Sequence, residues 1–176
     1  MSALRRHAAP GIAVLALAIA GAGGCAAGAD ANGSPAFRAG DLTVDHVVAP
    51  APVGDAAALY FRVASAGAAD TLDSIATPAA RSATLHEQMV HDGAMAMRAA
   101  PPLAVPAGGS VELAPGGTHV MLEGLTGSIA AGDSIPVTLT FRRSGTLSVV
   151  ARVVTYAQLE GALAPPADSM RPGARP

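Results

Sequence analysis

The chain has 176 residues, a formal net charge of −2 and a single cysteine. This length accommodates one ordinary domain and a processed segment, and it excludes a pair of large domains. The charge balance excludes a basic nucleic-acid-binding surface, and one cysteine excludes both an internal disulfide and a thiolate-rich metal site. The 20 Gly and 14 Pro residues, with only 14% charged residues, favour short strands and turns over long helices.

Residues 1–25 have the pattern of an export signal. Arg5 and Arg6 precede an uninterrupted apolar run at residues 11–20, which is about half the length that a membrane-spanning helix needs. Small residues then lead to Cys25, as in a bacterial lipobox whose cysteine is lipidated, although Ala stands where the lipobox usually has Leu. A conventional signal peptide cleaved a few residues later is the alternative. We therefore expect the mature chain in the periplasm or on the outer face of a bacterial membrane, attached only through a lipid on Cys25.

The rest of the chain divides into a tether, a domain and a tail. Residues 26–36 are small and polar with interspersed glycine, which predicts a flexible tether. Residues 160–176 are rich in proline and have no apolar periodicity, which predicts a disordered tail. The folded domain is therefore expected at residues 37–159.

The pattern within this domain is all-β, with seven to eight short strands expected. Alternating or β-branched residues mark nine candidate segments for these strands, of which 72–75 is the weakest, and the segments are 42–48, 57–64, 72–75, 83–90, 94–99, 111–113, 119–122, 135–141 and 147–154. The pair Asp92-Gly93 between two of these segments predicts a tight hairpin, since both turn positions can require positive φ. Turn residues every 8–12 positions are typical of a Greek-key sandwich or barrel.

Histidine and methionine are concentrated in residues 86–121. A thioether is a soft ligand and an imidazole a borderline one, so together they suit Cu(I) far better than Mg²⁺, Ca²⁺ or Mn²⁺. If the Asp-Gly pair forms the hairpin loop, Gln88 faces Met97 on the other strand. His86 and Met97 then become diagonal neighbours on one face, about 7–8 Å apart.

A second pair, His119 and Met121, is separated by one residue in the next strand, so both side chains share a face. We expect the two pairs to converge on one ion as a site of two nitrogens and two sulfurs. Their order is His86, ten residues, Met97, twenty-one residues, His119, one residue, Met121. This spacing resembles the signature of the periplasmic PCu(A)C copper chaperones.

The surrounding segments strengthen the resemblance, which covers about residues 42–154. The segments that look like those of the family are 85–87, 93–98, 106–109, 115–122 and the strand Ala58-Leu59-Tyr60-Phe61. An Asn that commonly follows this strand is replaced near Ala64-Ser65, which affects a turn rather than the site. The resemblance implies a monomeric cupredoxin-like Greek-key β-barrel or sandwich that binds one Cu(I) through His86, Met97, His119 and Met121. It also implies delivery of copper to the dinuclear copper site of cytochrome c oxidase, with an oxidase subunit or its assembly factors as partner.

Other functions fit the sequence less well. A blue-copper electron carrier needs a Cys thiolate between its His ligands, and Cys25 lies in the anchor region. A copper enzyme requires more His, and no nucleophile–base or carboxylate pair stands out, so we expect no enzyme. A periplasmic lipoprotein that stores copper for tolerance, or passes it to a transporter, would use the same ligands and remains the alternative. The tail contains Met170 but no His, so no second copper site is expected.

Four further side chains have open roles. Met95 shares the face of Met97 and is either a spare ligand or, as we favour, packing at the core or its rim. Met89 points to the opposite face and is expected in the core. His91 is expected to be solvated at the hairpin tip, and His46 to face solvent or form a hydrogen bond.

Overall fold

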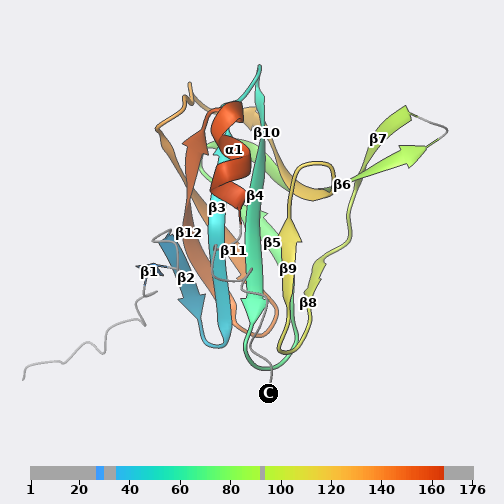
Figure 1. The fold of residues 1–176 in the computed structure, drawn as a ribbon, viewed down its shortest axis with the longest axis vertical. Helices are drawn as coiled ribbons and strands as arrows, with labels where there is room; N and C mark the ends of the chain where they lie inside the picture. The colour runs from blue at the N-terminus through green and yellow to red at the C-terminus, as the bar shows by residue number, and fades with distance from the viewer. Residues whose placement is uncertain (1–26, 30–34, 92–93, 165–176) are drawn as a thin grey trace, which may run out of the picture.

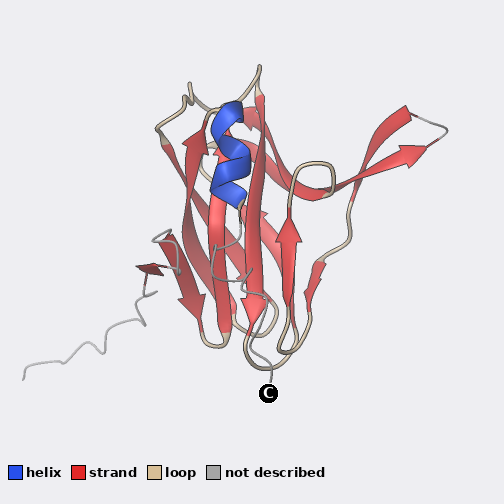
Figure 2. Cartoon of the chain, viewed as in Figure 1, coloured by secondary structure: helices blue, strands red, loops and turns tan. Residues whose placement is uncertain are grey.

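The computed structural model describes residues 27–29, 35–91 and 94–164, which are predominantly β-structure (Figure 2). The predicted signal peptide at residues 1–25, with Cys25, lies outside the described residues. The elements are β1 (Ala27–Ala29), β2 (Pro35–Ala39), β3 (Leu42–Pro50), β4 (Ala56–Ser65), β5 (Asp70–Ala76), β6 (Ala80–His91), β7 (Ala94–Ala99), β8 (Leu103–Val105), β9 (Ser110–Leu113), β10 (Thr118–Leu125), β11 (Ser134–Phe141), β12 (Gly145–Val154) and α1 (Tyr156–Leu163).

The strands follow one hydrogen-bonded path in the order β7-β6-β10-β4-β3-β12-β11-β5-β8. β3 and β12 pair in parallel, and the other neighbours on this path pair antiparallel. β4 is long enough to pair with β10 along its first half and with β9 along its second half. The strands surround a common interior, from which the β6–β7 hairpin projects (Figure 1). This projecting hairpin carries part of the predicted site.

The interior is filled by alternating residues of the strands. In β12 the residues Leu147, Val149 and Ala151 are buried and their neighbours in between are exposed. This alternation follows from the two-residue period of a strand with one solvated face. Each fully buried Val, Leu or Phe side chain contributes about 1.5–3 kcal/mol relative to exposure. The prediction of an all-β fold is confirmed, although the described residues form 12 strands rather than seven to eight.

The prediction of a flexible tether at residues 26–36 is wrong for its last two residues, which belong to β2. β2 begins at Pro35 and pairs with β3, with Phe37 opposite Val44, and Ala36 is buried. β1 in turn pairs with β2. The composition of these residues gave no strand signal because small side chains have weak β-propensity. Their strand conformation depends instead on backbone hydrogen bonds to a neighbouring strand.

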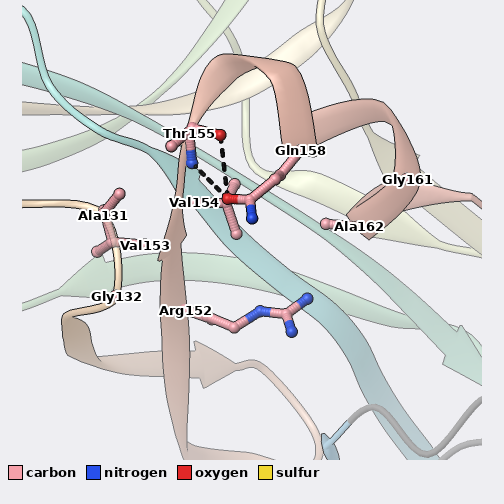
Figure 3. A pocket seen from close by; sticks show the side chains of 9 residues that line it. All are labelled: Ala131, Gly132, Arg152, Val153, Val154, Thr155, Gln158, Gly161 and Ala162. Carbon is pink, nitrogen blue, oxygen red and sulfur yellow. Dashed lines mark hydrogen bonds between the residues drawn. The ribbon is translucent and has the colours of Figure 1, made fainter.

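Helix α1 begins directly after β12. Thr155 is the N-cap residue in an extended conformation. The side-chain oxygen of Gln158 accepts hydrogen bonds from the backbone N–H and the hydroxyl of Thr155, at 3.1 and 3.0 Å (Figure 3). These bonds satisfy a donor that the first turn of a helix leaves without a partner. In the described ranges, no helix is long and apolar enough to cross a membrane.

The helix also corrects the predicted domain boundary. Its Leu159 is 6% exposed and packs with Val48, Tyr60 and Val154 in a cluster separate from the main core. The helix continues to Leu163, so the prediction of a disordered tail from residue 160 is wrong for residues 160–163. A single buried Leu within eight residues is too weak a periodic signal to predict a helix from sequence. The remainder of the predicted tail, residues 165–176, lies outside the described residues.

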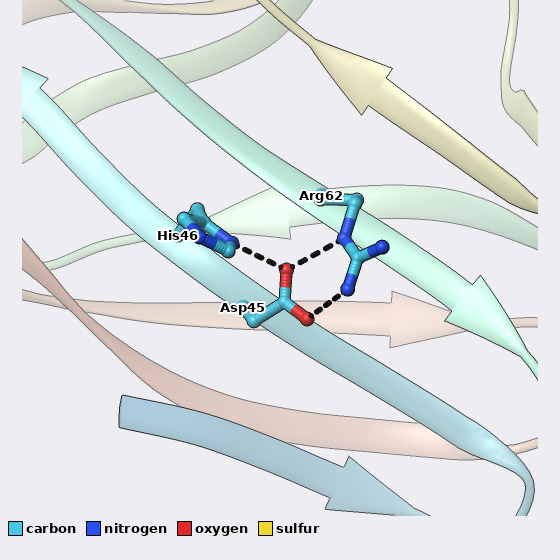
Figure 4. A network of polar contacts seen from close by, with 3 residues as sticks. All are labelled: Asp45, His46 and Arg62. Carbon is cyan, nitrogen blue, oxygen red and sulfur yellow. Dashed lines mark hydrogen bonds and ion pairs between the residues drawn. The ribbon is translucent and has the colours of Figure 1, made fainter. Parts of the chain in front are cut away.

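A polar cluster interrupts β3. The register with β4 shifts between Asp45 and Val48, and His46 has a φ of 54°. The carboxylate of Asp45 accepts hydrogen bonds from Nδ1 of His46 at 2.8 Å and from Nε and Nη2 of Arg62 at 2.9 and 2.7 Å (Figure 4). Burial alone would raise the pKa of Asp45, but the hydrogen bonds and charges of Arg62 and His46 hold this pKa below its ordinary value. His46 is therefore buried and hydrogen-bonded rather than solvent-facing.

Candidate metal site

The β6–β7 hairpin has the predicted register. Gln88 lies opposite Met97, and His91 lies opposite Ala94. His86 and Met97 therefore share one face of the hairpin as diagonal neighbours. The predicted loop residues 92–93 and the side chain of His91 lie outside the described part of the chain.

Strand β10 brings the second pair beside the first. His119 lies directly opposite His86 in the β6–β10 pairing, and Met121 lies opposite Thr84. The centroids of the two imidazole rings are 6.1 Å apart and the ring planes are inclined by 53°. The four predicted ligands thus lie on one face of the β7-β6-β10 portion of the sheet. The direct pairing of the two histidines is the part that sequence reasoning missed, because no local pattern specifies the register between β6 and β10.

The two methionines flank this histidine pair on opposite sides. Met97 is level with Gln88 and Met121 is level with Thr84, so their positions differ by four residues along β6. At about 3.3 Å per residue this offset is about 13 Å. The registers of β6 with β10 and with β7 therefore bring the two histidines together, with one methionine on each side. In this arrangement the four side chains do not surround a single ion.

The two methionines also differ in their surroundings. Met97 is 57% exposed on the projecting hairpin. Met121 is half-buried and lies in an apolar hollow that is also lined by Pro50, Ala58 and Tyr156. Met121 is consequently held by the body of the domain, whereas Met97 lies on β7, the terminal strand of the sheet path, which pairs with β6.

The ring nitrogens of the histidines are suited to a metal ion. Nδ1 of His119 lies 3.1 Å from the backbone oxygen of Gly117. A carbonyl oxygen only accepts, so Nδ1 carries the hydrogen and Nε2 retains its lone pair for a metal. In His86, Nε2 lies 3.0 Å from the hydroxyl of Thr84, while Nδ1 is buried without a hydrogen-bond partner. A buried polar atom without a partner is costly, and a bound ion would satisfy it.

Tyr60 supports His119 from the other side. The two rings have centroids 6.3 Å apart and are inclined by 55°. Tyr60 is buried in the cluster that includes Leu159 of α1, and burial raises the pKa of its phenol, with a smaller contribution from Tyr156. Tyr60 therefore belongs to the smaller of the two core clusters. Its contact with a candidate ligand had no signal in the sequence.

Other side chains of the hairpin occupy positions that the sequence did not predict. Arg98 donates from Nη2 to Oε2 of Glu87 at 2.9 Å, on the face opposite the candidate ligands. Met89 is 37% exposed, so its expected position in the core is wrong. Met95 is 63% exposed, so the expectation that it packs at the core or its rim is also wrong. The physical reason is that the hairpin projects beyond the layered body, so the sheet covers neither of its faces (Figure 1).

A separate hollow lies between α1 and β12. Its lining includes Gly132, Arg152, Gln158 and Ala162, and none of the four candidate ligands (Figure 3). Within the described residues, no group of three or more His, Cys, Asp or Glu side chains is arranged to hold a metal ion.

The fold is that of solved PCuAC domains. The apo PCuAC domain of PmoF2 is 25% identical with a TM-score of 0.58, and the match covers 68% of this chain and 94% of that domain. The apo structure of DR1885 from Deinococcus radiodurans is 27% identical with a TM-score of 0.53, covering 86% and 97%. The copper-bound PCuAC domain from PmoF2 is 24% identical with a TM-score of 0.59, covering 68% and 97%. The predicted cupredoxin-like fold is thereby confirmed.

The sequence also matches a family model. The model described as "Putative lipoprotein LpqE-like" matches residues 41–153, so the chain belongs to the LpqE-like family. A curated relative, "Putative lipoprotein Lxx21020" of Leifsonia xyli subsp. xyli, is 42% identical over 79 residues, which are 44% of this chain and 48% of the relative. The match thus spans about half the length of this relative. Together with the fold, the family match confirms the resemblance to the PCu(A)C proteins.

Proposed function

We propose that this protein is an extracytoplasmic copper chaperone that carries one Cu(I) on His86, Met97, His119 and Met121. The observation that supports it is the pair of facing imidazoles, 6.1 Å apart, with a thioether on each side along one face of the sheet. Imidazole and thioether together favour soft Cu(I) over hard divalent ions. The unpartnered Nδ1 of His86 and the oriented ring of His119 also fit a metal ligand role.

This ligand set suits transport in an oxidising compartment. Thiolates bind copper tightly but oxidise outside the cytoplasm, whereas thioethers form no disulfides. Two neutral imidazoles and two thioethers leave the positive charge on the ion, so the bound Cu(I) remains exchangeable. Neutral sulfur also disfavours Cu(II), which we expect to bind more weakly and with a different geometry.

Binding of all four ligands requires the hairpin to change shape. We expect His86, His119 and Met121 to bind the ion first, because the body of the domain holds His119 and Met121. The offset of about 13 Å between the levels of Met97 and Met121 then has to be shortened by bending β6–β7 toward β10. Copper binding should therefore slow amide hydrogen exchange in β7 more than in β12.

The acceptor in this proposal is the dinuclear copper site of cytochrome c oxidase, reached through an oxidase subunit or an assembly factor. The resemblance to the PCu(A)C chaperones supports it. A lipoprotein that stores copper, or passes it to a transporter, is the second candidate, since it needs the same ligands. The lipoprotein description of the family and of the Leifsonia relative favours a lipid on Cys25 and attachment at the outer face of a membrane.

X-ray absorption spectroscopy of the copper-loaded protein tests the ligand set. We expect both sulfur and imidazole scattering, and we expect the sulfur contribution to fall in Met97→Ala and Met121→Ala. Met89→Ala is the matched control, since this methionine is on the same hairpin but on its other face. Scattering from oxygen and nitrogen alone, or tighter binding of Cu(II) than of Cu(I), would overturn the proposal.

Gene deletion separates the two roles. If the protein delivers copper to the oxidase, the deletion strain should lose oxidase activity at low copper and recover it when copper is added. Intact oxidase activity together with copper sensitivity would instead favour storage or tolerance.

A further inference from the structure

Met95 is an exposed methionine that the four-ligand site does not use. It lies opposite Val90 in the hairpin and is two residues from Met97, so both thioethers are on the same face of β7. Its side chain is 63% exposed, which excludes a role in core packing. The thioether of Met95 is therefore accessible from solvent, on the face that carries the candidate ligands.

The sulfur and nitrogen donors on this face follow an order of increasing exposure. His119 is 5% exposed, His86 is half-buried, Met97 is 57% exposed and Met95 is 63% exposed. From the level of His86 to that of Met97, and from there to that of Met95, each step is two residues along the hairpin, or about 6.6 Å. The donors thus form a series that leads from the domain body toward the end of the hairpin.

The electrostatics of this face favour release of a cation along the series. The side chains of Gln88 and Ala99, next to Met97, are uncharged. The nearby charges of Glu87 and Arg98 pair with each other on the opposite face. No carboxylate among the described hairpin residues on the ligand face would therefore trap the ion. β7 is also the terminal strand of the sheet path, so its outer edge is open to an acceptor.

We propose that Met95 is the exit ligand of the copper site. As the ion leaves, a bond forms between copper and Sδ of Met95 while the bonds to His119 and Met121 break, and copper remains Cu(I) throughout. The acceptor then takes the ion at the edge of β7. This inference rests on the proposed copper-carrying function and adds the route by which the ion departs.

The test compares equilibrium binding with the rate of release. Met95→Leu keeps an apolar side chain of similar size without sulfur, and Met89→Leu is the matched control on the other face. Loaded protein is mixed with a chromophoric Cu(I) chelator in a stopped-flow instrument, and affinity is measured separately by competition. We expect unchanged affinity in both variants, and release about tenfold slower in Met95→Leu only, because a departing ion loses one stabilising ligand.

A second measurement observes the thioether itself. Ag(I), a redox-inert analogue of Cu(I), is titrated into protein labelled at the methionine methyl groups, and the Met95 methyl resonance should shift after those of Met97 and Met121. Wild-type release rates in Met95→Leu, or an unshifted Met95 methyl group, would overturn the inference. Reduced affinity in Met95→Leu would make Met95 a resident ligand and would also overturn the exit role. Absence of Cu(I) binding by the wild-type protein would instead refute the proposed function.

Discussion

The rings of Tyr60 and His119 lie side by side on β4 and β10, with centroids 6.3 Å apart. His86 lies on the other side of His119, so the buried imidazole stands between two rings in one row across three strands. His119 is therefore the most constrained of the candidate ligands. Its constraint originates in a cluster that includes helix α1, which the sequence did not predict.

Replacement of Tyr60 should separate packing from hydroxyl chemistry. Tyr60→Ala is expected to lower the free energy of unfolding by about 3–5 kcal/mol and to weaken Cu(I) binding, because the ring beside His119 is lost. Tyr60→Phe retains the ring and should bind Cu(I) like the wild type. Urea denaturation and competition with a Cu(I) chelator measure the two effects. Wild-type affinity in folded Tyr60→Ala would contradict the positioning role.

Removal of Leu159 tests whether α1 is part of the folded domain. Leu159 is buried against Val48, Tyr60 and Val154, so Leu159→Ala should lower the free energy of unfolding by about 2–3 kcal/mol. Glu160→Ala alters an exposed neighbour on the same helix and should change stability by less than about 0.5 kcal/mol. Equal effects of the two substitutions in thermal or urea denaturation would show that the helix is not docked.

The ion pair of Asp45 and Arg62 should matter more than an exposed one. Arg62→Gln leaves the buried carboxylate of Asp45 without its main partner, so we expect its pKa to rise and the stability at pH 7 to fall by about 2–3 kcal/mol. Arg142→Gln breaks the exposed pair with Asp73 and should change the stability much less, because solvent screens that pair. Carbon-13 NMR titration of Asp45 and urea denaturation measure these changes. An unchanged Asp45 pKa in Arg62→Gln would contradict the assignment.

Asp70 should contribute to the loss of stability in acid. Burial alone would raise its pKa, but hydrogen bonds from Ser144 and from the amides of Thr71 and Arg143 lower it to about 2, from an ordinary value of 3.8. A folded-state pKa below the unfolded value stabilises the protein fully above the unfolded pKa, and this contribution is lost as the pH falls from 3.8 toward 2.

The variant Asp70→Asn has no carboxylate, so it lacks the hydrogen bonds that the charged group accepts. It should therefore be less stable than the wild type at pH 7, by about 1–3 kcal/mol. It should also lose less stability between pH 4 and pH 2, which thermal denaturation over that range would measure. A parallel decline of both proteins with pH would show that the carboxylate of Asp70 is not the titrating group.

Much of the strand arrangement was predictable from local patterns. Alternation of apolar and polar residues identified β12 because one face of the strand is buried, and the Asp-Gly pair predicted the register that places Gln88 opposite Met97. The proposed ligand set also rests on local sequence, because thioethers and imidazoles indicate a soft metal wherever they lie. Helix α1 was missed because its Leu159 packs against Val48 and Tyr60, which lie far away in the chain. The strand β2 was missed because its small side chains give little strand signal, although its partner β3 follows it directly.

The sequence by itself therefore determined the all-β class, the hairpin that carries His86 and Met97, and the side-chain chemistry of the candidate ligands. Only the tertiary structure decided that His86 faces His119, that Tyr60 lies against His119, and that Met95 remains exposed. The physical reason is that strand pairing between β6 and β10 joins segments with no local turn between them. Their register is fixed by burial of Leu85 and Val120 against the common core, which becomes possible only when the whole sheet has formed.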